Sequence, residues 1–331
     1  MLMDVPLYPL QFEPILKRLI WGGRRLATIL NKSLGQESDY AESWEVSDYG
    51  DDVSRVTNGP LAGMSLRSLV RERGAELFGQ AMGPCHQFPL LVKFLDANRV
   101  LSVQVHPDDE RGRRLAGDNG KTETWVIVHA EPGSLIYAGL CPGVTRASFA
   151  AALETGQVEP LLHRFEARAG DCIMIPAGTV HAIGAGVVLA EIQQMSDATF
   201  RVYDWGRVDA SGQPRKLHLA EALESTNFDA GPVNPIVPTA EPIASGQRER
   251  LSHCRYFALE RLRLTAPTAV GAGSNDRFTI LIGLAGSGEL RHAGASHALR
   301  FGETRLLPAC LGPCEFVPSG SEACVLTCMV P

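Results

Sequence analysis

Apolar and polar residues alternate strictly along the segment Leu101–His106 (LSVQVH). Because successive side chains of a β-strand point to opposite faces, Ser102, Gln104 and His106 would share one face of such a strand. The opposite face would carry only aliphatic side chains. A polar row backed by an apolar row is the pattern of a strand that lines a cavity, so this segment predicts a polar cavity.

A second segment and one carboxylate supply partners for that polar row. The second segment runs from Gly170 through a β-rich stretch to Pro176 and reaches His181 (GDCIMIPAGTVH), which is typical of a strand followed by a turn. Glu123 stands between the two segments, in the sequence GKTE.

Four side chains in these stretches can ligate a metal: Gln104, His106, Glu123 and His181. Zinc accepts imidazole nitrogen and carboxylate oxygen, and a catalytic zinc site keeps one position open for water or substrate. The set has no thiolate, which argues against a closed structural site. The residues therefore predict a catalytic zinc site; the alternative is that Gln104 and His106 are ordinary polar residues of a half-buried strand.

The spacing Gly170-x5-Pro176-x-Gly178-x2-His181 is similar to the second motif of the cupin β-barrels, in which the histidine enters the barrel. Over most of its length the chain resembles the type I mannose-6-phosphate isomerases in their short bacterial form. The blocks that carry this resemblance are IWGG (Ile20–Gly23), ESWEVS (Glu42–Ser47), FPLLVKFLDA (Phe88–Ala97), LSVQVHPDD, GKTE (Gly120–Glu123), PAGTVHAIG (Pro176–Gly184) and SDATFRVYDW (Ser196–Trp205). The resemblance implies the same four metal ligands, with one zinc ion per chain.

The resemblance also implies the fold, a mainly β chain of two cupin (jelly-roll) β-barrels with a few short helices packed on the first. We expect residues 1–240 to form the catalytic metal-binding domain and residues 248–331 a degenerate C-terminal cupin domain. The proline-rich, glycine-punctuated stretch 208–247 favours a boundary between them. Hydrophobic periodicity predicts helices over Ser65–Gly79 and Thr145–Gly156.

The second expected barrel keeps part of the cupin spacing without its ligands. Gly302-x5-Pro308 repeats the spacing of Gly170-x5-Pro176, but Cys310 and Pro313 stand where Gly178 and His181 stand in the first barrel. We therefore expect no metal in the second barrel. A four-thiolate zinc site at Cys310, Cys314, Cys324 and Cys328 is the alternative, although these cysteines lie in strand-like apolar runs, where free cysteine behaves as a small buried hydrophobe.

The run Phe88–Ala97 is apolar except for Lys93 in its middle and Asp96 near its end. An unpaired ammonium in a buried strand costs several kcal/mol, roughly, so an anionic group should lie against it. The alternative is a lysine that reaches the surface along its aliphatic stem. The resemblance implies that Lys93 binds the phosphate of the substrate together with the hydroxyl of Ser102.

Ionisable residues crowd the stretch from Val187 to Arg201, which predicts a proton-transfer site; solvated surface charge is the alternative. The resemblance implies that Arg201 is catalytic. Glu191 and Lys121 are the candidate proton carriers, and Asp197 would orient Arg201 or Lys121. Longer members of the family carry a histidine where this chain has Gly120, so a mechanism that needs that histidine does not transfer to this chain.

These features predict a zinc-dependent aldose–ketose isomerase that interconverts mannose 6-phosphate and fructose 6-phosphate through an enediolate. One alternative is a metal-dependent cupin oxygenase, which would favour three histidines or two histidines and one carboxylate. The other is a non-catalytic sugar-phosphate-binding cupin, because fold alone does not give function.

Composition limits the partners of the chain. Its 331 residues carry a net charge of −6 without a basic block, which argues against nucleic acid and against an anionic membrane surface. The first residues (MLMDVPLYPLQFEP) combine an acid with prolines, unlike a signal peptide, so we expect a cytoplasmic protein. We expect a small hexose phosphate as its ligand, and a monomer or a weak homodimer.

Overall fold

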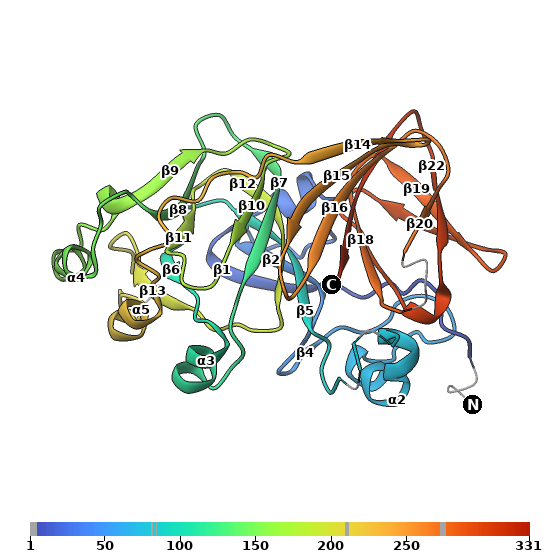
Figure 1. The fold of residues 1–331 in the computed structure, drawn as a ribbon, viewed down its shortest axis with the longest axis horizontal. Coiled ribbons are helices and arrows are strands. Elements are labelled where there is room, and N and C mark those ends of the chain that lie inside the picture. The colour runs from blue at the N-terminus through green and yellow to red at the C-terminus, as the bar shows by residue number, and fades with distance from the viewer. Residues whose placement is uncertain (1–4, 81, 84, 209–211, 272–275) are drawn as a thin grey trace.

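The chain folds into two β-units that lie side by side (Figure 1). The computed structural model describes residues 5–80, 82–83, 85–208, 212–271 and 276–331. We call the strands up to β13 the N-terminal unit and those from β14 onward the C-terminal unit. Each unit has two antiparallel sheets, so the predicted mainly β, jelly-roll fold is confirmed, with the barrels built as double-sheet sandwiches.

In the N-terminal unit, a six-stranded sheet faces a five-stranded one. The six-stranded sheet has the order β1 (Ile15–Gly23), β2 (Tyr40–Val46), β5 (Leu90–Ala97), β12 (Val187–Gln194), β7 (Glu123–Ala130) and β10 (Cys172–Ile175). The five-stranded sheet has the order β13 (Phe200–Tyr203), β6 (Val103–Val105), β11 (His181–Ile183), β8 (Leu135–Leu140) and β9 (Leu162–Glu166). The short strands β3 (Asp48–Tyr49) and β4 (Asp52–Val53) form a separate ribbon.

The C-terminal unit repeats this plan with a six-stranded and a four-stranded sheet. The larger sheet has the order β14 (Thr239–Ile243), β15 (Gly246–His253), β16 (Ala258–Leu264), β23 (Ala323–Met329), β18 (Thr279–Ala285) and β21 (Thr304–Leu307). The smaller has the order β17 (Thr268–Val270), β22 (Cys314–Pro318), β19 (Ser287–His292) and β20 (Ala295–Arg300). Strand β14, the first of the C-terminal unit, begins at Thr239. The division into a domain of residues 1–240 and a domain of residues 248–331 stays a prediction.

Strand β5 is buried on both faces, which explains why its sequence is almost continuously apolar. Val92 and Phe94 point outward into the large apolar cluster that joins the two units. Leu95 and Ala97 point inward, between the two sheets of the N-terminal unit. Lys93 belongs by its parity to this inward row, so the strand delivers one cation to the interior.

The joint between the units is itself a hydrophobic core. Outward-facing residues of β5 and β12 pack with Leu259 of β16, Ile280 of β18 and Leu326 of β23, and helix α2 closes the cluster with Leu69 and Phe78. The amino-terminal segment also crosses to the C-terminal unit, because the backbone of Leu10 forms two hydrogen bonds with Leu306, of 2.8 and 2.9 Å. This packing couples the C-terminal unit to the sheet that carries the candidate site.

The predicted helices are confirmed. Helix α2 (Leu66–Phe78) begins where the Ser65 side chain accepts a hydrogen bond from the Ser68 amide, and α4 (Arg146–Thr155) begins with a capping box at Thr145. Residues of α4 and α5 pack on the outer face of the five-stranded sheet. The remaining short helices are α1 (Arg25–Thr28), α3 (Asp109–Arg111), the π-helix Gly112–Ala116, α5 (Leu219–Ser225) and the 3-10 turns Glu159–Leu161 and Ala309–Leu311.

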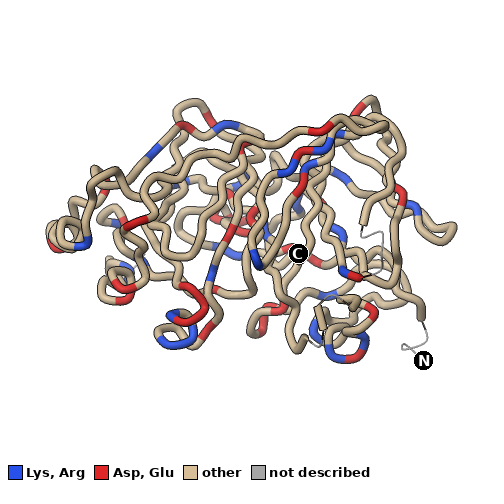
Figure 2. The backbone as a smooth tube through the Cα atoms, viewed as in Figure 1, with Lys and Arg blue, Asp and Glu red and all other residues tan. Residues whose placement is uncertain are grey.

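Charges are dispersed over both units. Lysine and arginine (blue) and aspartate and glutamate (red) are scattered over the tube in Figure 2, in keeping with the absence of a basic block from the sequence. Among the described residues, no helix is both long enough and apolar enough to span a membrane.

Candidate active site and metal centre

Three strands bring the predicted metal ligands together. In the five-stranded sheet His181, the first residue of β11, pairs directly with Gln104 of β6. Glu123, the first residue of β7, enters from the opposite sheet, where it pairs with Gln193 of β12. The turn before β11 needs a glycine, because Gly178 has φ +88° and donates its N–H to the carbonyl of His106 at 2.8 Å.

The ligand atoms of His106, Glu123 and His181 all lie within 4.8 Å of one another. His106 Nε2 is 3.4 Å from Glu123 Oε2, and His181 Nε2 is 3.5 Å from Glu123 Oε1. Each side chain is 1 % exposed. The amide of Gln104 lies 3.3 Å from His181 Nε2, at the edge of the same group. Among the described residues this is the one cluster of histidine, cysteine or carboxylate side chains close enough to hold a metal ion.

Both imidazoles are oriented by their other ring nitrogen. His106 Nδ1 lies 2.9 Å from the carbonyl oxygen of Ala198, and His181 Nδ1 lies 2.9 Å from that of Thr179. A carbonyl accepts only from N–H, so the proton of each neutral ring sits on Nδ1 and leaves a lone pair on Nε2. Burial, followed by the charge of Lys121, lowers the pKa of His106 to about 4, and burial also lowers the pKa of His181. The rings are therefore neutral at pH 7, as metal ligation requires.

Glu123 is ionised although it is buried. Burial opposes its ionisation, but the charge of Lys121 outweighs that cost and holds its pKa well below the usual range. Lys121 Nζ lies 3.0 Å from Glu123 Oε2. Even so, neither carboxylate oxygen of Glu123, nor His106 Nε2, forms a hydrogen bond of normal geometry. Buried polar atoms without such partners are uncommon in folded proteins and require an explanation.

Lys93 does have anions against it, as the sequence predicted. Its Nζ lies 3.0 Å from Glu191 Oε1 and 3.3 Å from Glu42 Oε2. Burial alone would lower the pKa of Lys93, but the charges of Glu191 and Glu42 raise it well above its ordinary value. Lys93 is thus a buried cation matched by two carboxylates, and it does not reach the surface.

These groups line one polar cavity of about 300 Å³. Its walls include Ser102, Lys121, Glu191, Asp197 and Arg201, so the structure brings every predicted catalytic and substrate-binding residue to the same space as Gln104 and Lys93. The metal-ligand group of His106, Glu123 and His181 adjoins it through Gln104 and Lys121.

Arg201 of β13 is half buried beside this cavity. One guanidinium nitrogen donates to the carbonyl oxygen of Lys216 at 2.8 Å, while Nε is buried without a hydrogen bond. Burial, and then the neighbouring charge of Arg215, lower the pKa of Arg201. Among the described residues no hydrogen bond or ion pair joins Asp197 to Arg201 or Lys121; the Asp197 amide instead donates to Asp118 at 2.9 Å.

Comparison with known proteins decides the family. A mannose-6-phosphate isomerase of Bacillus subtilis is 35 % identical over 329 residues, which cover 96 % of this chain and 98 % of that protein. A probable mannose-6-phosphate isomerase of the same organism is 35 % identical over 323 residues, 94 % of this chain and 99 % of that one. The model for the catalytic domain of type I phosphomannose isomerases matches residues 10–122. The chain belongs to the type I phosphomannose isomerase family.

The solved structures agree with this membership. The crystal structure of the mannose 6-phosphate isomerase from Bacillus subtilis has a TM-score of 0.88 and 30 % identity, with 98 % of this chain and 99 % of that one covered. A mannose 6-phosphate isomerase bound with zinc and yttrium has a TM-score of 0.75 at 18 % identity, over 97 % and 99 % of the two chains, which shows the shared fold. The prediction that this type I phosphomannose isomerase family member is an enzyme is confirmed.

Sequence reasoning missed three residues of the candidate site. Glu42 of β2 neutralises Lys93, and its position inside the block ESWEVS was the available signal. Trp125 donates its indole N–H to Glu191 Oε2 at 3.0 Å and packs edge-on against His181. Arg215 lines the cavity beside Arg201 and is bound to Asp204 at 2.5 Å.

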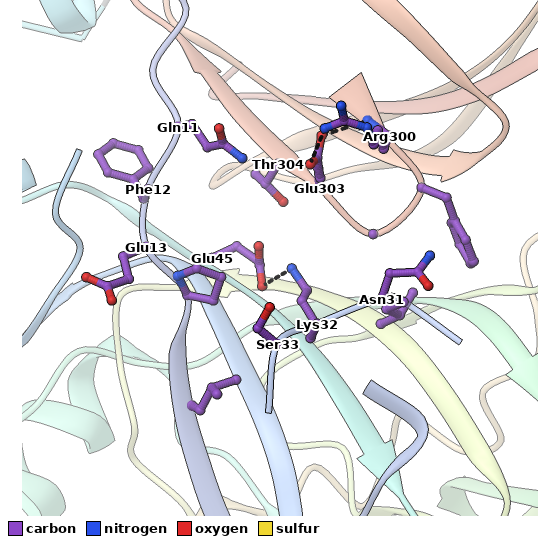
Figure 3. A pocket seen from close by; sticks show the side chains of 15 residues that line it. Gln11, Phe12, Glu13, Asn31, Lys32, Ser33, Glu45, Arg300, Glu303 and Thr304 are labelled. Atoms are coloured by element: carbon purple, nitrogen blue, oxygen red, sulfur yellow. Dashed lines mark hydrogen bonds and ion pairs between the residues drawn. The ribbon is translucent and has the colours of Figure 1, made fainter. Parts of the chain in front are cut away.

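A larger cavity of about 470 Å³ lies between the two units (Figure 3). Four of its charged side chains are paired, Lys32 with Glu45 at 2.6 Å and Arg300 with Glu303 at 3.2 Å. It contains none of the predicted site residues. The smaller cavity beside the histidines is therefore the candidate active site.

Proposed function

We propose that this chain interconverts mannose 6-phosphate and fructose 6-phosphate in the polar cavity, with one zinc ion held by His106, Glu123 and His181 and by Gln104 as a fourth ligand. The observation that carries the proposal is a group of buried acceptor atoms without hydrogen-bond partners, converging within 4.8 Å beside a cavity with two lysines and two arginines. The names of the relatives supply the substrate.

The residues fit a divalent cation. Neutral imidazoles with free Nε2 lone pairs and an ionised carboxylate are the ligands of catalytic zinc sites. The two ends of the Gln104 amide exchange by a half-turn, which would point its oxygen at the same group. A cation there would also satisfy His106 Nε2 and both oxygens of Glu123. When bound, zinc would supply a Lewis acid beside the sugar oxygens.

The isomerisation moves one proton from C2 of the aldose to C1, and Glu191 is placed to carry it. The Trp125 indole fixes Oε2 of Glu191, while Oε1 lies buried without a hydrogen bond of normal geometry, 3.0 Å from Lys93 Nζ and 3.8 Å from Lys121 Nζ. One oriented oxygen is what a general base needs. In this proposal the Lys121 ammonium gives a proton to O1 of the sugar and takes one from O2, so that no net proton is gained or lost, and the positive charge of Lys93 lies beside Glu191.

Arg201 would stabilise the enediolate. Removing the proton from C2 places negative charge on the sugar oxygens, and a preorganised donor aimed at that charge lowers the barrier by a few kcal/mol, roughly. The buried Nε of Arg201 has no partner among the described residues and borders the cavity. Asp197, which also lines the cavity, would act through its charge, since no contact with Arg201 supports an orienting role.

For the phosphate, we propose two anchors of unequal strength. Lys93 and Ser102 line the cavity and remain substrate-binding residues in this proposal. However, Lys93 already faces two carboxylates. By contrast, the single carboxylate of Asp204 pairs with both Arg207 and Arg215, and no carboxylate in the described part of the chain forms an ion pair with Arg201. The arginine side thus carries the surplus positive charge and would bind more of the phosphate.

A coupled assay of the purified, zinc-loaded protein with mannose 6-phosphate tests the function. We expect fructose 6-phosphate as the product and about one zinc per chain by elemental analysis. Consumption of dioxygen with iron in the site would instead indicate a cupin oxygenase. Tight binding of the sugar phosphate without turnover, in the presence of zinc, would indicate a non-catalytic binding protein.

A further inference from the structure

The short segment Gly120–Glu123 carries both a metal ligand and the lysine beside it, and its backbone is held at each residue. The Gly120 amide donates to Asp109 Oδ1 at 3.1 Å, and the Lys121 amide donates to the carbonyl of Pro107 at 2.9 Å. The Thr122 amide donates to Gln194 Oε1 at 2.9 Å. These bonds fix where the side chains of Lys121 and Glu123, 3 % and 1 % exposed, enter the site.

Gly120 permits this close approach to Asp109. A Cβ atom at residue 120 would lie 2.4 Å from the Asp109 nitrogen and 2.5 Å from the Asp108 carbonyl carbon. Both atoms belong to the backbone at the start of α3 and cannot rotate away, so a side chain would push the segment off α3. The glycine that replaces the histidine of longer family members thus has a structural consequence in this chain: it seats the segment directly on Asp109.

Asp109 is held from its other side by the C-terminal unit. Its Oδ2 accepts from the hydroxyl of Tyr256 at 2.7 Å and from Arg255 at 2.7 Å, both of which immediately precede β16. Its Oδ1 also accepts from Gln194 Nε2 at 2.9 Å. A continuous chain of hydrogen bonds therefore runs from Tyr256 through Asp109 and Gln194 to the amides of residues 120 and 122.

The C-terminal unit touches the candidate site at two more points. Arg261 of β16, 6 % exposed, donates to the carbonyl of Gly170 at 2.7 Å, at the start of the hairpin that leads to His181. The hydroxyls of Ser252 on β15 and Thr124 on β7 lie 3.3 Å apart, next to Glu123 in the sequence. Two ligand-bearing segments of the N-terminal unit are thus supported from the C-terminal unit.

We propose that the C-terminal unit positions the segment Gly120–Glu123, and that Tyr256 and Asp109 are the positioning residues through which it does so. The proposal deepens the proposed function and rests on it for its kinetic part. Neither residue contacts the cavity, so neither acts on substrate. Their effect comes through Lys121 and Glu123, whose displacement by about 1 Å is enough to cost on the order of a hundredfold in rate.

The test is Tyr256→Phe, which removes the hydroxyl and keeps the ring. We expect kcat to fall about three- to thirtyfold, the range of coupling carried by such networks, while KM stays within about twofold. We also expect faster hydrogen exchange in the peptide that contains residues 120–122 and faster loss of the metal to a chelator. Asp109→Asn, which keeps an acceptor for Gly120 but gives the Tyr256 hydroxyl an amide in place of a carboxylate, should give the same pattern.

Tyr137→Phe is the matched control. Tyr137 also donates to a carboxylate, Glu159 Oε1 at 3.1 Å, but lies outside the chain of bonds. The Tyr137→Phe variant should have at most a lower melting temperature. Its kcat, and its hydrogen exchange at residues 120–122, should be those of the wild-type protein. If Tyr256→Phe behaves like this control, the contact is only structural and the proposal is overturned.

Failure of the proposed function is separable from failure of this inference. If the wild-type protein shows no isomerisation, hydrogen exchange and metal release still compare Tyr256→Phe with Tyr137→Phe. Altered exchange at residues 120–122 in the first variant alone supports positioning, whatever the reaction. Unaltered exchange and metal release in both variants overturn it.

Discussion

The two units share one scaffold and differ in what fills it. Between the sheets of the N-terminal unit, Lys93, Glu123 and Glu191 occupy inward positions beside an apolar half that contains Leu95 and Ile127. Between the sheets of the C-terminal unit, the corresponding space holds an apolar core that includes Leu264, Leu281, Leu290, Phe316 and Val325. One charged side chain, Arg305, is buried there and donates to the carbonyl of Ala298. The sheets alone therefore do not make a site; the inward side chains do.

The hairpins of the two units separate the structural part of the cupin motif from the chemical part. Gly170 and Gly302 both have positive φ, +94° and +78°, and each is followed by a four-residue strand and a proline. After Pro176 the chain turns at Gly178 and delivers His181 to the metal group. After Pro308 it forms the 3-10 turn Ala309–Leu311 instead. Both units keep the glycine and the proline because these residues shape the hairpin. A histidine at the end of the hairpin is expected only in the unit that is proposed to bind a metal.

The largest effect that would sharpen this contrast is loss of the metal from the N-terminal unit. His106→Ala or His181→Ala removes one of three converging ligands, so zinc content should fall from about one per chain to near zero and isomerase activity should disappear. Elemental analysis and the coupled assay on the same preparation measure both. Asn119→Ala is a nearby control that leaves the ligand group intact. A variant that lost activity but retained its zinc would mean that the ion is bound elsewhere.

The next effect concerns Arg201, which lines the cavity of the N-terminal unit. Arg201→Lys and Arg201→Ala should keep full zinc content and lose on the order of a hundredfold or more in kcat, because an enediolate donor acts only along the reaction path. Lysine is a poor substitute, since a point charge lacks the planar fork of donors. Zinc content, melting temperature, kcat and KM are measured together; a raised KM with near-normal kcat would make Arg201 a binding residue.

The part of this site that could be predicted from the sequence follows from local patterns, above all from the alternation of side chains along a strand. The alternation in Leu101–His106 placed Gln104 and His106 on one face, and the cupin spacing placed His181, because both patterns are local in sequence. Lys93 in an apolar run required a buried anion, and the structure supplies two. Parity assigns a residue to a face, and desolvation cost says that a partner exists.

The partners themselves were not predictable in this way. Which carboxylate meets Lys93 depends on the pairing of β5 with β2 and β12, and the identity of Glu42 as a partner follows only from that register. Tyr256 and Asp109 meet because two units pack together, and no local pattern marks either residue. The orienting role assigned to Asp197 lacks a supporting contact for the same reason: closeness in sequence does not fix which side chains meet.

A smaller effect tests where the phosphate binds. Arg215→Met should raise KM for mannose 6-phosphate about tenfold, as expected for loss of a charge-assisted hydrogen bond, with little change on unphosphorylated mannose. Asp204 keeps Arg207 in this variant. Lys93→Met should raise KM less but lower the melting temperature more, because it leaves Glu42 and Glu191 buried without their cation. The opposite ranking of the two KM values would make Lys93 and Ser102 the main anchor.

The smallest effect is expected from the cysteines of the C-terminal unit, where a second metal would abolish the contrast between the units. Cys314 is buried among apolar side chains, whereas Cys324 is buried beside Arg263, its partner on the neighbouring strand. Burial raises the pKa of the Cys314 thiol to about 11 and also raises that of Cys324. Zinc binds the thiolate, so thiols that remain protonated at pH 7 are poor ligands.

Cys314→Ala and Cys324→Ala should therefore keep about one zinc per chain and normal kcat. Each should cost only about 1 kcal/mol of stability, as expected when one small group is deleted from a core. Elemental analysis with thermal unfolding measures both quantities. Two zinc ions in the wild-type protein, with one lost in either cysteine variant, would show that the C-terminal unit binds metal through its thiols. That result would contradict the inference that only the N-terminal unit holds a metal.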